Sequence, residues 1–113
     1  MAKQITFNFE GTDYTLEYTR ATIRDMERSG FNIDDIDVKP MTILPDLFRG
    51  AFLAHHRFVK AEVVNRIFEA MADKYALVKS LAEMYYEPIN TLMEEPENGG
   101  NLKWTPNWET KNE

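Results

Sequence analysis

The sequence predicts a small α+β protein that is mainly α: an N-terminal β-hairpin packed on a bundle of about four helices, with a flexible C-terminal tail. Three observations predict this class. Apolar residues alternate over the first 18 positions, they recur at helical spacing from about residue 20 to residue 94, and Pro, Gly and Asn interrupt every pattern after that. A chain of 113 residues can build one modest core.

The first 18 residues have the period of two that is typical of β-strands. Apolar side chains occupy every second position of residues 5–9 and again of residues 14–18. Residues 10–13 supply the turn, because Gly11 adopts positive φ without steric cost. An isolated hairpin is marginally stable in water, so we expect its aromatic face to lie on the helices that follow.

The first helix has clear signals at both ends. Thr19 or Thr22 can cap its start, and Gly30 follows its end at Arg28. Residues 32–39 are acidic and predict an irregular connection or a single helical turn.

Two further helices follow from apolar residues at helical spacing. The earlier one is expected to start at Thr42 or Leu44, with Pro45 in its first turn, where a missing N–H costs little. Gly50 in this helix indicates the close approach of a neighbouring backbone. The later one spans about residues 61–71.

The last helix is expected to run from about Asp73, a plausible N-cap, to Glu94. Pro88 lies inside it, and a proline there removes one backbone hydrogen bond. Either the helix kinks before Pro88, which we favour, or a new helix begins there. The apolar face of this helix is predicted to consist of Tyr75, Val78, Leu81, Met84, Tyr85, Ile89, Leu92 and Met93.

These elements divide the chain into two parts. Residues 1–94 form the hairpin-plus-helices domain, and residues 95–113 form a flexible acidic tail that contains both tryptophans. Five glutamates and two lysines give residues 94–113 a net charge of −3.

Several classes of function are disfavoured by composition and spacing. The net charge of −6 argues against nucleic-acid binding, and the absence of cysteine excludes thiolate chemistry. The chain contains no signal-peptide pattern and no apolar run long enough to span a membrane. His55 and His56 are adjacent, so on a helix they cannot chelate one ion together. We therefore predict no catalytic residue, no cofactor and no metal, and a protein that is not an enzyme.

The strongest candidates for a binding surface are the two tryptophans of the tail. Trp104 and Trp108 lie beyond a Gly-Gly linker, and tryptophan is enriched where protein interfaces carry most of their energy. We favour a segment that orders on a partner protein. The alternatives are a tail that folds back onto its own core and tryptophans without a role.

The end of the last helix supplies the other candidates. Met84 and Tyr85 are ordinary core residues for a small helical domain, although methionines beside tyrosines also form adaptable binding surfaces. Residues nearer the edge of the domain are better placed for a partner: Tyr86, Pro88, Ile89, Leu92 and Met93.

The order of these elements resembles that of a known family. The start of the hairpin (residues 3–7), residues 22–27, the block of residues 44–52, the step at residues 86–89 and a terminal tail with tryptophan are similar to the tail assembly chaperones of long-tailed bacteriophages and prophages of Gram-positive bacteria. The resemblance covers nearly the whole chain, and its motifs are packing patterns rather than chemical signatures.

The resemblance implies a non-enzymatic chaperone that acts in the cytoplasm of the bacterial host and is absent from the mature virion. Such proteins bind the tape measure protein, keep it soluble and help to recruit tail tube subunits, and copies of them can associate with one another. Neither nucleic acid nor a membrane is an expected partner. Two other classes stay open: a small phage regulatory or host-protein-binding module, and a minor structural subunit of the tail or its connector.

Overall fold

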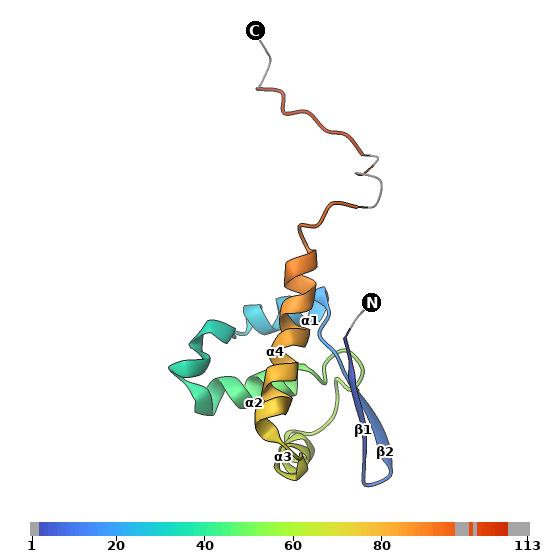
Figure 1. Cartoon of the computed structure of the whole chain (residues 1–113), viewed down its shortest axis with the longest axis vertical. Helices are drawn as coiled ribbons and strands as arrows, with labels where there is room; N and C mark the ends of the chain where they lie inside the picture. The colour runs from blue at the N-terminus through green and yellow to red at the C-terminus, as the bar shows by residue number, and fades with distance from the viewer. Residues whose placement is uncertain (1–2, 97–99, 101, 109–113) are drawn as a thin grey trace.

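A computed structural model describes residues 3–96, 100 and 102–108, and it confirms the predicted class of fold. An antiparallel two-stranded hairpin precedes four α-helices, with a short 3₁₀ helix (η1) between the first two (Figure 1). The elements are β1 (Ile5–Phe9), β2 (Thr12–Leu16), α1 (Arg20–Arg28), η1 (Ile33–Asp37), α2 (Pro40–Gly50), α3 (Ala61–Ala70) and α4 (Lys74–Thr91).

The hairpin has a tight two-residue turn. Phe9 lies opposite Thr12, and between them Glu10 and Gly11 both have positive φ, 51° and 85°. Turns of this kind match the right-handed twist of paired strands. The side chain of Asn8 supports the turn by accepting a hydrogen bond from the amide of Gly11 at 3.1 Å.

Helix α1 begins and ends as predicted. Thr19 is its N-cap and forms a reciprocal capping box with Thr22, so both threonines take part. Gly30 has a φ of 95° after the last turn. The amide of the buried Phe31 then donates to the carbonyl oxygen of Met26 at 3.0 Å, which folds the chain back onto α1.

Helix α2 begins earlier than predicted. It starts at Pro40, so Pro45 lies inside the helix and not in its first turn. Pro40 occupies the first helical position, where no N–H is required. Pro45 leaves the carbonyl of Met41 without its helical donor, and Met41 is on the surface, where water can bond that carbonyl. Two prolines five residues apart are therefore compatible with one helix.

Gly50 allows a close approach, but the neighbour is a side chain and not a backbone. A Cβ atom at Gly50 would lie 2.5 Å from the sulfur of Met26. The glycine thus lets α1 and α2 pack with a methionine between them.

One core joins the hairpin to the helices. Its largest fully buried side chains come from β2 and from α2, α3 and α4 together with the turn after α2: Leu16, Leu47, Phe48, Phe52, Ile67 and Leu81. The hydroxyl of Tyr18 donates to the carbonyl oxygen of Leu47 inside this core. Burial raises the pKa of Tyr18 well above its usual value.

Helix α4 is one helix that runs through Pro88, so no second helix begins there. Its buried face differs from the predicted one: it consists of Leu77, Leu81, Met84 and Tyr85, whereas Tyr75 is 94% exposed. Arg20 lies beside the end of α4 and donates to the carbonyl oxygen of Thr91 at 3.2 Å.

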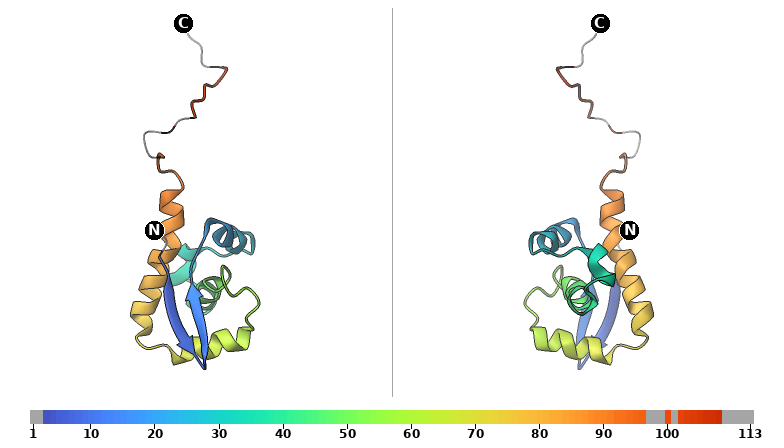
Figure 2. Two further views of the ribbon diagram at one scale, coloured as in Figure 1. Left: turned by 90° about the vertical axis from the view of Figure 1, so that its right-hand side faces the viewer. Right: turned by 90° about the vertical axis from the view of Figure 1, so that its left-hand side faces the viewer.

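The hairpin and α4 lie side by side. Figure 2 shows α4 running along the β1 side of the hairpin, and Lys3 at the start of β1 forms ion pairs with Glu83 and Glu87 of α4. None of the helices in the described part of the chain is long and apolar enough to cross a membrane.

Candidate partner-binding surface

The candidate residues at the end of α4 lie where they can meet a partner. Tyr86, Ile89, Leu92 and Met93 are exposed, and Pro88 is half-buried. Tyr86 and Ile89 are three residues apart on α4, which places them on one side of the helix axis, and Leu92 and Met93 follow the end of the helix. We call Tyr86, Ile89, Leu92 and Met93 the helix-end surface.

The two tryptophans of the tail are also exposed. Trp104 and Trp108 are 81% and 79% exposed, and Leu102 near them is exposed as well. Residues 102–108 contain no helix or strand and stand away from the helices (Figure 1). The structure therefore does not place either tryptophan on the protein's own core. The predicted flexibility of residues 95–113 stays a prediction, and residues 97–99, 101 and 109–113 lie outside the described part.

Met84 and Tyr85 belong to the core and not to a binding surface. The ring of Tyr85 contacts Tyr18 and Phe31 edge-on, with ring centroids 5.3 and 5.5 Å apart. Burial is the main reason that the pKa of Tyr85 rises to about 12, and the nearby carboxylate of Glu27 adds to the rise. The boundary between core and surface thus falls between the adjacent residues Tyr85 and Tyr86.

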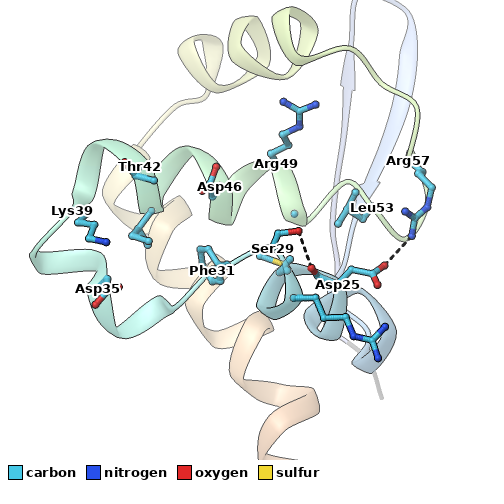
Figure 3. A pocket seen from close by; sticks show the side chains of 15 residues that line it. Asp25, Ser29, Phe31, Asp35, Lys39, Thr42, Asp46, Arg49, Leu53 and Arg57 are labelled. Carbon is cyan, nitrogen blue, oxygen red and sulfur yellow. Dashed lines mark hydrogen bonds and ion pairs between the residues drawn. The ribbon is translucent and has the colours of Figure 1, made fainter.

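A cleft of about 690 Å³ was not predicted from the sequence (Figure 3). It lies between α1, η1, α2 and the chain after α2, and its apolar lining comes from Met26, Phe31, Ile43 and Leu53. Charged side chains of both signs surround it: Asp25, Arg28, Asp35, Lys39, Asp46, Arg49 and Arg57. These charges are dispersed along the sequence, so no local motif could have revealed the cleft. Arg57 and Asp25 close one side through an ion pair of 3.3 Å.

The two histidines fasten the hairpin to the chain after α2. The amide of Thr15 donates to Nε2 of His56 at 3.0 Å, and Nε2 of His55 lies 2.7 Å from a carboxylate oxygen of Glu17. In the described ranges 3–96 and 102–108, no group of three or more His, Cys, Asp or Glu side chains is arranged to hold a metal ion. The geometry gives the histidines a structural role.

The contacts of His56 and Glu17 should weaken in acid, so we expect the protein to be less stable there. Burial lowers the pKa of His56 from 6.5, and His55 adds to that effect. The hydrogen bond with His55 lowers the pKa of Glu17 from 4.5, against the opposing effect of burial. A group whose pKa is lower in the folded chain than in the unfolded chain stabilises the fold at pH values above its unfolded pKa. For His56 and for Glu17, this stabilisation is lost as the pH falls through the pKa of the group in the folded chain. We expect the urea midpoint to fall between about pH 7 and about pH 4.

The substitution His56→Gln separates the contribution of His56 to the pH dependence of stability from that of Glu17. Glutamine can still accept the amide hydrogen bond of Thr15, but it does not titrate. We expect the variant to lose less stability than the natural chain as the pH falls below 6.5, and still to lose the Glu17 contribution as the pH falls below 4.5. Urea unfolding followed by circular dichroism measures both profiles, and parallel curves would rule out a role for His56 in the acid response.

Comparison with known proteins finds one family. The family model described as "Domain of unknown function (DUF5055)" matches residues 1–108. No curated protein and no solved structure matches the chain.

Proposed function

We propose that this chain, which belongs to the DUF5055 family, is a non-enzymatic tail assembly chaperone that binds and solubilises a phage tape measure protein and helps to recruit tail tube subunits. The observation that supports the proposal most strongly is the exposure of large apolar side chains at one end of the protein. They comprise Leu92, Met93, Leu102, Trp104 and Trp108, all at the end of α4 or beyond it.

The energetics of this surface suit reversible binding. A tryptophan can bury about 150–250 Å² of surface, so two of them gain on the order of 10 kcal/mol at about 25 cal/mol per Å². Ordering a seven-residue segment costs roughly 7–14 kcal/mol of backbone entropy. The two terms nearly cancel, so one copy binds weakly. Several copies along one elongated partner would bind firmly through multivalency and could still be released one by one.

A tape measure protein is a suitable target for such a surface. The resemblance implies a partner that is long and helical and whose helices expose apolar stripes. A helix-end surface and a tail with tryptophan can cover short stretches of such a stripe. We place the action of the protein in the cytoplasm of the bacterial host and outside the mature virion.

Deleting residues 95–113 tests the proposal. The tape measure protein of the same phage is expressed alone, with the full chain or with the truncated chain, and its soluble fraction is measured. We expect the full chain to keep the partner soluble and the truncated chain to fail. The truncated chain should unfold at the same urea concentration as the full chain, since the described residues of the deleted segment lie outside the core.

Two other results would contradict the proposal. If the truncated chain kept the tape measure protein fully soluble, the tail would not be part of the binding surface. Absence of any effect of the full chain on the tape measure protein would favour a regulatory or host-protein-binding module. Mass spectrometry of purified particles separates the chaperone from a structural subunit, because a tail or connector subunit stays in the virion.

A further inference from the structure

The outer edge of β1 carries free backbone groups. The two-residue turn makes Phe9 and Thr12 the first hydrogen-bonded pair, so residues 5, 7 and 9 direct their N–H and C=O groups toward β2. Gln4, Thr6 and Asn8 direct theirs to the opposite side. In residues 3–96 and 102–108, no group forms a hydrogen bond with the backbone of these three residues.

The outer edge of β2 is covered. There the amide of Thr15 donates to His56, and the amide of Glu17 donates to the carbonyl oxygen of Ala51 at 3.0 Å. Among the described residues, the hairpin is therefore covered on one side only. An open strand edge is a template on which another extended segment can pair.

The tail contains a segment with the pattern of a strand. Residues 102–108 alternate strictly between apolar and polar side chains, with Leu102, Trp104, Pro106 and Trp108 in one set and Lys103, Thr105 and Asn107 in the other. This alternation predicts a strand with one buried and one solvated face. The described segment has no such cover in the structure, where both tryptophans are exposed.

Pro106 determines how this segment can pair with β1. In antiparallel pairing, the polar residues 103, 105 and 107 would face the free groups of Gln4, Thr6 and Asn8, and the nitrogen of Pro106 would point to solvent. In parallel pairing, the apolar set would have to donate hydrogen bonds to β1, and Pro106 has no N–H to donate. The proline is compatible with the antiparallel orientation alone.

One antiparallel register matches side chains on both faces. With Thr105 opposite Thr6, the apolar face brings Trp104 opposite Phe7, and an aromatic cross-strand pair of this kind is stabilising. On the polar face, Lys103 lies opposite Asn8, whose amide donates to the carboxylate of Asp13 at 2.8 Å. The one charged residue of the segment thus lies on the same face as the carboxylate of Asp13, with Asn8 between them.

A hollow lies beneath the position of the added strand. It measures about 410 Å³ and lies between Lys3, just before β1, and α4, whose lining residues are Ala82 and Tyr86 together with the polar Lys79, Glu83, Glu87 and Asn90. Since α4 runs along the β1 side of the hairpin (Figure 2), the apolar face of a third strand would lie toward this helix, where Ala82 and Tyr86 offer it apolar contact. Ile5, Phe7 and Phe9, which are only half-buried, would gain cover at the same time.

We infer that the outer edge of β1 binds residues 102–107 of a second copy of this chain as an antiparallel third strand. The 11 residues from Thr91 to Leu102 reach about 36–40 Å when extended, so chain length alone permits either copy. Antiparallel pairing within one chain requires the tail to run the length of the hairpin before it turns back. Residues 102–108 instead stand away from their own body (Figure 1), where the edge of another copy can meet them.

Disulfide trapping tests the pairing directly, because the chain has no cysteine of its own. Thr6→Cys and Thr105→Cys are made in separate copies, which are mixed and mildly oxidised. Hydrogen-bonded antiparallel partners have Cα atoms about 5.5 Å apart, within reach of a disulfide. The matched control replaces Thr6→Cys with Thr15→Cys, since Thr15 is opposite Thr6 in the hairpin but on the covered edge.

We expect the Thr6 and Thr105 pair to yield about tenfold more covalent dimer than the control pair, because the docked tail has a high effective concentration at β1. Equal yields would refute the pairing. A chain that carries both substitutions and forms only an internal disulfide would show that each tail binds its own hairpin, which would also refute the inference.

Exchanging Thr105 and Pro106 provides a second test with unchanged composition. The exchange moves the proline to a position whose N–H must face β1, so we expect self-association in sedimentation velocity to weaken by about tenfold or more. Pro106→Thr alone should leave self-association unchanged. If the exchange variant associated as strongly as the natural chain, the predicted register would be wrong. Both tests use the purified chain without a tape measure protein, so their outcome is independent of the proposed function.

Discussion

Replacing Phe48 with alanine should destabilise the fold severely, by about 3–5 kcal/mol. The side chain of Phe48 is 1% exposed, and its ring contacts Phe52 and Phe68 at centroid distances of 5.2 and 5.1 Å. Removing the ring takes away its burial and leaves a cavity between α2 and α3. Small domains are stable by only about 5–15 kcal/mol, so the variant should lose a large share of its free energy of unfolding.

Urea unfolding followed by circular dichroism measures this effect, and Phe58→Ala is its matched control. Phe58 is the same residue type ten positions later, but it is 93% exposed. We expect the control to change the free energy of unfolding by less than about 0.5 kcal/mol. Similar midpoints for Phe48→Ala and the natural chain would mean that the aromatic contacts between α2 and α3 do not stabilise the core.

The hairpin and α1 could be predicted because short-range chemistry determines them. The alternation of residues 5–9 has only one regular solution, and Gly11 and Gly30 adopt positive φ at the places where the chain must turn. Thr19 caps α1 through contacts within three residues. Signals of this range are present in the sequence itself.

The start of α2 and the buried face of α4 could not be predicted, because they depend on contacts distant in sequence. Pro45 lies inside the helix, one turn after the exposed Met41, and not in its first turn. Tyr75 has the spacing of a core residue, yet it is exposed in the part of the chain that the structure describes, and Leu77 is buried instead. A helical period specifies that a face exists, and the neighbouring elements decide which residues it contains.

In the candidate surface too, some features depend on short-range signals and others on contacts distant in sequence. The place of the tryptophans beyond a Gly-Gly linker favoured an exposed segment but left a tail folded back onto the core open, and the cleft beside α1 depends on residues 25–57 being folded together. The free edge of β1 is intermediate between these cases. The sequence predicts the strand, but only the structure shows that the chain after α2 covers β2 and leaves β1 open.

The double substitution Trp104→Ser and Trp108→Ser should abolish the solubilisation of the tape measure protein while the domain stays folded. Both side chains are about four-fifths exposed, so their removal costs the fold little. Each removes about 150–250 Å² of surface that could be buried on a partner. Because the gain from the tryptophans nearly equals the cost of ordering the tail, losing them should leave no net affinity.

The soluble fraction of the co-expressed tape measure protein measures this effect, and the double substitution Phe58→Ser and Tyr75→Ser is the matched control. These two aromatic residues are more than nine-tenths exposed but lie on the folded body, away from the tail. The control should retain full rescue, and equal loss in both variants would show that surface aromatic content alone matters.

Exchanging Thr105 and Pro106 keeps both tryptophans and disturbs only pairing with β1. If the exchange variant still solubilises the tape measure protein and the variant without tryptophans does not, the tryptophan side chains contact the partner directly. If both variants fail, self-association is required for rescue.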